Sequence, residues 1–117
     1  MEPFRITENA PLVRIDIQGE FSLEFTDTLK RTLKRILDDP AYRIVAVDLE
    51  SATFMDSSGI GFLVASATRL RSQDKQFYLL KPNPKVRRIL SLVKLETFFD
   101  CLESDAELNA LVQSQIP

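Results

Sequence analysis

Polar and apolar residues alternate early in the chain and then change to a helical period. The alternation over Leu12–Ile17 predicts a strand with one wet face, and Phe4–Thr7 predicts a shorter strand before it. Glu8–Pro11 is expected to join the two strands as a hairpin turn, and Gly19 to end the second one. Over Thr26–Asp38 the pattern predicts a helix, whose apolar face consists of Phe25, Leu29, Leu33, Ile36 and Leu37.

Strands and helices alternate through the rest of the chain. Ile44–Leu49 is almost continuously apolar, which is typical of a central strand, and Thr53–Met55 is expected to be the tail of a buried strand. Further strands are predicted at Phe77–Leu80 and Thr97–Leu102. Three helices are predicted between and after these strands, with inward positions at Ile60, Leu63, Val64, Ala67 and Leu70, at Val86, Ile89, Leu90 and Val93, and at Leu108, Leu111 and Val112.

Capping residues mark the starts of the predicted helices. Ser22 or Thr26 is expected to cap the first helix. Asn83 and Pro84 suit the N-cap and first position of the third helix. The stretch Ser104–Glu107 has the spacing of a capping box, in which a serine is followed three residues later by a glutamate, and it predicts the start of the last helix.

The order of these elements predicts an α/β domain with crossover connections. Because the opening hairpin is antiparallel, we expect a mixed, mostly parallel β-sheet of four to five strands flanked by about four α-helices. The chain has 117 residues, which is the size of one compact domain with a single core. Residues 1–117 are therefore expected to form a single domain.

Charge and composition narrow the class of protein. The chain has 15 basic and 17 acidic side chains, and this balance argues against direct nucleic-acid binding, which usually requires a basic excess. Its one cysteine, Cys101, excludes an internal disulfide and is compatible with a reducing cytosol. Met1–Arg5 does not resemble the start of a signal peptide, and no apolar run approaches the about 20 residues that span a bilayer. We expect a cytoplasmic protein without membrane insertion.

The sequence contains no histidine, and this limits the chemistry that the chain can perform. Histidine is the commonest general base and a common ligand of transition metals, so a Ser-His-Asp hydrolase is excluded and an ordinary zinc site is not expected. There is also no glycine-rich phosphate loop of the P-loop type. The sequence therefore predicts neither a catalytic residue nor a metal or other cofactor.

Asp56-Ser57-Ser58-Gly59 lies at the hinge between a strand and the second helix, and its residues have two interpretations. In the first, a serine caps the helix, and the spacing alone favours this interpretation. In the second, one serine is a phosphorylation switch. A phosphate adds about −1.5 to −2 charges and is tolerated at a helix start, where free N–H groups and the helix dipole favour an anion, yet it would repel a partner built for a neutral hydroxyl.

Two stretches that cover most of the chain resemble the STAS domain family, in particular the anti-sigma factor antagonists. They are VAVDLESATFMDSSGIGFLVASATRL, residues 45 to 70, and LLKPNPKVRRILSLVKLETFFDCLES, residues 79 to 104. The resemblance implies a small mixed sheet flanked by helices, a STAS-like fold. It also implies a non-enzymatic protein that binds an anti-sigma factor serine kinase when dephosphorylated, and so frees the sigma factor for transcription.

The resemblance assigns a role to each hinge residue. The kinase phosphorylates the first serine, which is Ser57 here, and this breaks the complex until a serine phosphatase resets it. Asp56, Ser58 and Gly59 are expected to shape the docking surface around Ser57.

Three further positions bear on partner binding. Ser22 occupies the place near the switch serine where similar proteins carry an acidic residue, and the turn Ser72–Lys75 lacks the glycine that is usual there. Phe62 lies off the predicted inward face of its helix, so we expect it either to be an exposed part of the partner-binding surface or to be partly buried under a loop.

Two other functions stay open. STAS-like modules also serve in larger signalling assemblies and beside membrane transport complexes, where the hinge would be an unmodified docking surface. An enzyme would have to depend on Asp56 and Ser57, and no base for that pair is evident.

Overall fold

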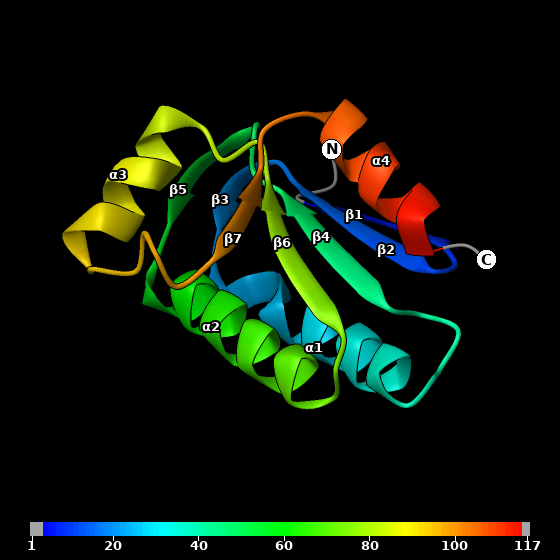
Figure 1. Ribbon diagram of the computed structural model, residues 1–117. Helices are drawn as coiled ribbons and strands as arrows, with labels where there is room; N and C mark the ends of the chain where they lie inside the picture. The colour runs from blue at the N-terminus through cyan, green and yellow to red at the C-terminus, as the bar shows by residue number, and fades with distance from the viewer. Residues whose placement is uncertain (1–3, 116–117) are drawn as a thin grey trace.

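Five strands form the main sheet of the computed structural model, which describes residues 4–115 apart from the side chains of residues 23–26 (Figure 1). In spatial order they are β1 (Phe4–Asn9), β2 (Leu12–Ile17), β4 (Ile44–Asp48), β6 (Gln76–Leu80) and β7 (Asp100–Leu102). β1 pairs with β2 in antiparallel fashion, and every other pairing is parallel. The prediction of a mixed, mostly parallel sheet in a single α/β domain is therefore confirmed.

Two short strands form a second, parallel sheet beside the main one. They are β3 (Gly19–Phe21) and β5 (Ala52–Met55). The prediction that Gly19 ends the preceding strand was wrong, because its left-handed φ of +78° turns the chain directly into β3. The prediction of a buried tail at Thr53–Met55 was also wrong in part, since Met55 is buried but Thr53 and Phe54 are exposed.

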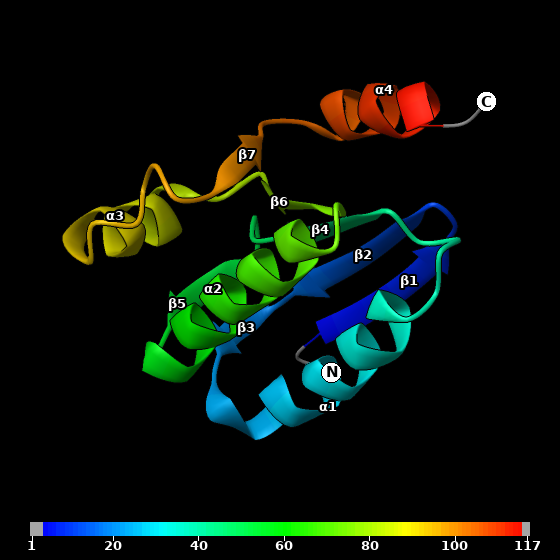
Figure 2. The same ribbon diagram turned by 60° about the horizontal axis from the view of Figure 1, so that its bottom comes forward.

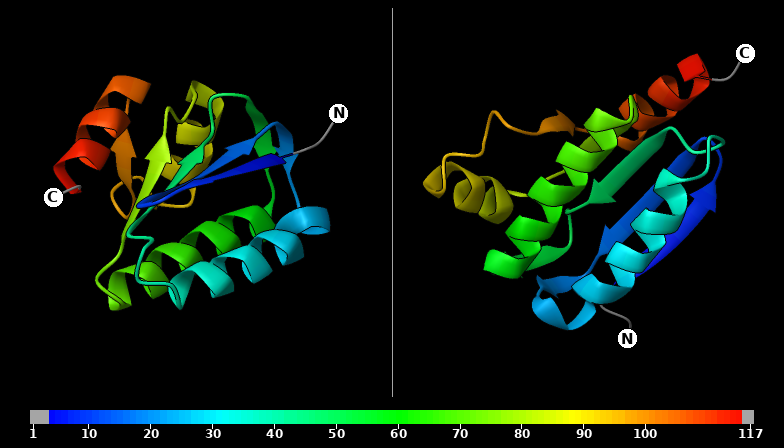
Figure 3. Two further views of the ribbon diagram at one scale, coloured as in Figure 1. Left: turned by 90° about the vertical axis from the view of Figure 1, so that its right-hand side faces the viewer. Right: turned by 90° about the horizontal axis from the view of Figure 1, so that it is seen from below.

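Four helices surround the sheet: α1 (Leu23–Leu37), α2 (Ser57–Ser72), α3 (Pro84–Leu92) and α4 (Asp105–Gln115). Figures 1 and 2 show α1 and α2 side by side against one face of the main sheet. Figure 3 shows α4 on the opposite face, at the β7 edge, while α3 lies beside β5. Because α4 covers only part of its face, the remainder of that face, over β1 and β2, is open.

Two apolar clusters lie on the two faces of the sheet. The larger lies between the sheet and the helices α1 and α2, and it includes Ile15, Val47, Leu29 and Leu63. The smaller consists of Ala46, Leu80 and Leu108, and it holds α4 on the other face. All five residues of β4 are buried, which confirms the prediction of a central strand from continuous apolar sequence.

The predicted helix starts were mostly found. Asn83 Oδ1 accepts a hydrogen bond of 3.0 Å from the Val86 N–H, and Ser104 Oγ accepts one of 3.1 Å from the Glu107 N–H. Ser22 is the N-cap of α1 but makes no side-chain cap bond, and Thr26 lies inside the helix, so it is not the cap. The prediction that the Phe25 side chain faces inward falls on side chains that the structure does not describe.

Two predicted boundaries and one predicted inward position were wrong. Glu8 and Asn9 belong to β1, so only Ala10 and Pro11 form the hairpin turn. The last strand begins at Asp100 rather than Thr97, because the preceding residues form a turn. Val93 was predicted to face inward, yet it is the exposed C-cap of α3, where the chain leaves the helix.

Candidate functional site

The carboxylate of Asp56 caps α2 at the hinge between β5 and that helix. Asp56 is the N-cap of α2, with extended backbone angles, and its Oδ1 accepts a 2.9 Å hydrogen bond from the Gly59 N–H. Its carbonyl oxygen accepts the Ile60 N–H at 3.1 Å, which begins the helical ladder. The interpretation of a serine as the cap was therefore wrong, because the aspartate before it already satisfies the donor that a cap serves.

Ser57 is the first residue of α2, and it is exposed. Its hydroxyl makes no hydrogen bond with any residue that the structure describes, so neither the cap nor the fold depends on it. The N–H groups of Ser57 and Ser58 lie in the first turn, where no carbonyl oxygen of the same helix can reach them. An enzyme or partner can reach the Ser57 hydroxyl from solvent, and an anion there would meet free donors and the positive end of the helix dipole.

Gly59 lets the second sheet pack closely against the hinge. A Cβ atom at this position would lie 2.7 Å from the carbonyl oxygen of Phe21 and 2.9 Å from its ring. That same carbonyl oxygen accepts the Asp56 N–H at 3.3 Å. Ser22 follows Phe21 directly, so the close contact brings Ser22, which is half-buried, to the hinge. The structure thus places Ser22 beside the hinge that is formed by Asp56, Ser57, Ser58 and Gly59.

Phe62 is not part of the exposed surface. Its side chain is 3% exposed, and its ring centroid lies 5.7 Å from that of Phe21. Both alternatives for this position were wrong, because the ring is neither exposed nor partly buried under a loop but is covered by β3 and α1. A partner cannot contact the ring while it is covered in this way.

The aromatic residue that is exposed at the hinge is Phe54, which was predicted to lie in the tail of a buried strand. Phe54 is 51% exposed and pairs in register with Glu20 of β3, which is also exposed. Alternation along a four-residue strand gave no usable indication of which face would be covered. The exposure of Phe54 places an aromatic side chain three residues from Ser57.

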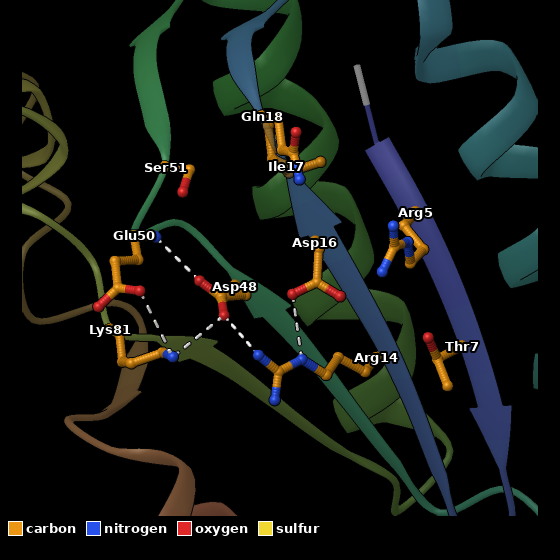
Figure 4. A pocket seen from close by; sticks show the side chains of 10 residues that line it. All are labelled: Arg5, Thr7, Arg14, Asp16, Ile17, Gln18, Asp48, Glu50, Ser51 and Lys81. Atoms are coloured by element: carbon orange, nitrogen blue, oxygen red, sulfur yellow. Dashed lines mark hydrogen bonds and ion pairs between the residues drawn. The ribbon is translucent and has the colours of Figure 1, made fainter. Parts of the chain in front are cut away.

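A second candidate site is a polar cavity of about 410 Å³ on the open face of the sheet (Figure 4). Arg14 and Lys81 lie at its centre, and three carboxylates surround them, those of Asp16, Asp48 and Glu50. Arg14 contacts the Asp48 carboxylate at 2.6 Å. The alternating polar residues of β2 had indicated a wet face, but not this cluster, because its members come from separate strands and from the chain beyond them.

The charges in this cavity largely satisfy one another and also hold α4. Asp105, at the start of α4, accepts hydrogen bonds from Arg14 at 2.9 Å and from Lys81 at 3.2 Å. The hydrogen bond from Arg14, followed by that from Lys81, lowers the pKa of the Asp105 carboxyl below its usual value. Lys81 adopts a left-handed φ of +49° as the chain leaves β6. We interpret the cluster as a set of ion pairs that attach α4 to the sheet.

Metal sites, membrane-spanning helices and a reactive cysteine are not seen in residues 4–115. Over that range, no group of three or more histidine, cysteine, aspartate or glutamate side chains is arranged to hold a metal ion. Within the same range, none of the helices has the length and apolar character to cross a membrane. Cys101 is half-buried, and that burial raises the pKa of its thiol, which disfavours the reactive thiolate.

Sequence comparison shows which known proteins this chain is similar to. The family model described as the STAS domain matches residues 4–108 of the chain. A STAS-domain containing protein of Pseudomonas aeruginosa is 32% identical over 85 residues, which are 73% of this chain and 82% of that protein. An anti-sigma-B factor antagonist of Staphylococcus aureus is 27% identical over 82 residues, which are 70% of this chain and 75% of that protein.

Solved structures share the fold. The anti-sigma factor antagonist SpoIIAA in its unphosphorylated form is similar to this chain with a TM-score of 0.80 and 20% sequence identity, over 97% of this chain and 98% of that one. The phosphorylated form of SpoIIAA from Bacillus is similar with a TM-score of 0.75 and 19% identity, over 92% of this chain and 98% of that one. At these identities the likeness concerns the fold alone.

Proposed function

The chain belongs to the STAS domain family, and we propose on that basis that it is an anti-sigma factor antagonist controlled by phosphorylation of Ser57. In its dephosphorylated form it binds an anti-sigma factor that is a serine kinase, and the sigma factor is then free to direct transcription. The observation that carries this proposal is the exposed, unbonded hydroxyl of Ser57 at the start of α2.

The modification step is an ordinary phosphoryl transfer. The kinase transfers the γ-phosphoryl group of ATP to Ser57 Oγ, so that an O–P bond forms, ADP leaves, and the hydroxyl proton passes to the kinase. A serine phosphatase later hydrolyses the ester with water and restores the hydroxyl. In this proposal the chain contributes position rather than catalysis, and the Asp56 carboxylate serves as the helix cap, its Oδ1 accepting the Gly59 N–H at 2.9 Å.

The fold is suited to a switch that acts on the surface and leaves the core unchanged. Asp56 caps α2, so a phosphate on Ser57 would replace no structural hydrogen bond. The free N–H groups of the first turn and the helix dipole favour the added anion. A partner surface complementary to a neutral hydroxyl would instead meet about −1.5 to −2 charges, and like-charge contacts across an interface cost several kcal/mol.

The residues around Ser57 have supporting roles in this proposal. Asp56 fixes the hinge, Gly59 allows Phe21 to approach, and Ser58 with Ser22 forms the half-buried border of the contact. The partners are the kinase and the phosphatase, and the chain itself acts in the cytoplasm as a non-enzymatic protein that uses no cofactor and contacts neither nucleic acid nor membrane. Its net charge of −2 fits a protein partner better than a nucleic acid.

Phosphorylation by purified kinase tests the proposal. The chain is incubated with ATP and each candidate anti-sigma factor kinase of its source cell, and phosphate is located by mass spectrometry. We expect one phosphate on Ser57, its loss in Ser57→Ala, and its retention in the matched variant Ser58→Ala. A kinase that binds the chain tightly and never modifies it would contradict the proposal, and it would favour an unmodified docking module in a larger assembly or transport complex.

A further inference from the structure

Among the side chains that the structure describes, three large apolar ones are exposed, one on β5, three residues before Ser57, and two at the end of α3. Phe54 of β5 is 51% exposed, Leu92 at the end of α3 is 75% exposed, and Val93 at the α3 C-cap is 46% exposed. We call these three residues the apolar patch. The elements that carry them, α3 and β5, are in contact, and both run toward the end of the molecule where α2 begins (Figures 1 and 2).

Packing within the chain does not account for the apolar patch. Val86 and Leu90 already attach α3 to the core, and both are buried. Leu92 lies on a different side of the helix, and Val93 follows its last turn. Exposed apolar side chains that gather on neighbouring elements mark an interaction site more often than isolated ones do.

Unpaired positive charges border the apolar patch on the α3 side. Lys85, Arg88 and Lys94 are exposed, and none of them forms an ion pair with a residue that the structure describes. Arg87, on the same helix, differs from them, because it pairs with Glu103 and is turned toward β7. A partner that covered the patch would gain apolar burial at its centre and would meet free cations at its edge.

The hinge itself offers little surface for affinity. Ser57 and Ser58 are small and polar, and Gly61 has no side chain, with open space where a Cβ atom would stand. The energy of a protein interface usually comes from a few buried aromatic, aliphatic or arginine anchors near its centre, not from small polar residues. The anchors that hold a partner at Ser57 must therefore come from the neighbouring surface.

We propose that the apolar patch of Phe54, Leu92 and Val93 is the docking surface for the kinase that modifies Ser57, and that the kinase meets it with an apolar pocket rimmed by carboxylates. This inference rests on the proposed function above and adds the part of the surface that supplies affinity. Ser57 then lies at the border of the contact, where its hydroxyl can enter the kinase's site while Phe54 and Leu92 are held.

Binding measurements with surface variants test the inference. The kinase identified by its labelling of Ser57 is titrated with the wild-type chain, with Phe54→Ser and with Leu92→Ser, without ATP hydrolysis. We expect each serine variant to raise Kd at least tenfold, while the urea midpoint changes little because both side chains are exposed. If Phe54→Ser does not fold, the Kd of Leu92→Ser alone tests the inference, because Leu92 is the most exposed of the three residues.

Charge reversal provides a matched pair of variants. Arg88→Glu, at the border of the apolar patch, should weaken binding tenfold or more, and Lys34→Glu, at an exposed position of α1, should leave Kd unchanged. Unchanged Kd values for Phe54→Ser and Leu92→Ser, with normal labelling of Ser57, would overturn this inference and leave the proposed function intact. Absence of binding and of labelling with every candidate kinase would contradict this inference and the proposed function together.

Discussion

At the scale of single residues, two glycines near the start of α2 have different structural roles. Gly59 is buried and faces the Phe21 carbonyl oxygen, where an added Cβ atom would lie only 2.7 Å away. Gly61 is exposed, and an added Cβ atom would meet nothing within 4 Å. The fold therefore requires glycine at position 59 and not at position 61.

This difference predicts opposite effects of the same substitution. Gly59→Ala should lower the free energy of unfolding by about 1–3 kcal/mol, because the methyl group has to displace backbone atoms of β3. Gly61→Ala should raise it by up to about 1 kcal/mol, since alanine is the better helix former. Urea unfolding of both variants checks this, and a fall in stability for Gly61→Ala would show that the exposed glycine has a structural role.

The Asp56 carboxylate is the second residue-scale determinant of the hinge. Asp56→Ala removes the acceptor for the Gly59 N–H and should cost about 1 kcal/mol of stability, as the loss of a helix cap usually does. Ser57→Ala is the control, and its unfolding midpoint should stay close to that of wild type because the hydroxyl is exposed and unbonded. Equal losses for the two variants would mean that the serine shares the capping role.

At the scale of elements, the sequence correctly predicted features that depend on residues close together in the chain, such as a helix start or a buried strand. Asn83–Pro84 located the start of α3, and the apolar run at Ile44–Leu49 located the central strand. The second sheet was missed, because a strand of three residues such as β3 has no readable period and its pairing with β5 is made across 30 residues of chain or more. Phe62 was misplaced because α2 packs against both β6 and α1, so it buries more than one face.

The candidate site divides in the same way. The hinge residues are adjacent in sequence, so their chemistry could be predicted from spacing and resemblance. The exposure of Phe54 and Leu92 and the charge cluster around Arg14 depend on contacts between distant elements, which one sequence does not reveal. The turn after α2 needed the structure as well, since Asp74 adopts the left-handed φ of +59° that glycine would favour.

The attachment of α4 leads to a prediction about pH. Asp105→Asn should weaken the attachment by less than about 1 kcal/mol at neutral pH, because the Asp105 side chain in these ion pairs is 54% exposed and its charge is screened by solvent. The folded-state pKa of Asp105 is lowered, so its contribution is present above the unfolded pKa and is lost as pH falls through the folded value.

Stability measured from pH 7 down to pH 2 tests this prediction. Wild type and Asp105→Asn should differ at neutral pH and converge in acid, and hydrogen exchange should locate the difference in α4. Asp27→Asn, at an exposed position of α1 that makes no ion pair with a described residue, is the control. A gap that widens as pH falls would contradict the assigned role of the carboxylate.

At the scale of the whole molecule, the switch and the core are separate. The two apolar clusters lie against the faces of the sheet, while Ser57 is exposed at one end of the domain, outside both clusters. We therefore predict that Ser57→Asp unfolds within about 0.5 kcal/mol of wild type, as surface substitutions usually do, and yet loses the kinase. Circular dichroism and urea unfolding check the fold, and a large loss of stability would mean that the switch acts by unfolding.

The measurement that tests the central claim most directly is the affinity of the kinase for the chain with and without a phosphate on Ser57, compared by titration calorimetry at one salt concentration. A like-charge penalty of a few kcal/mol corresponds to about a hundredfold or more in Kd, so the phosphorylated chain should bind at least a hundredfold more weakly. Equal affinity of the two forms would contradict the claim that this domain transmits its signal through the charge at Ser57.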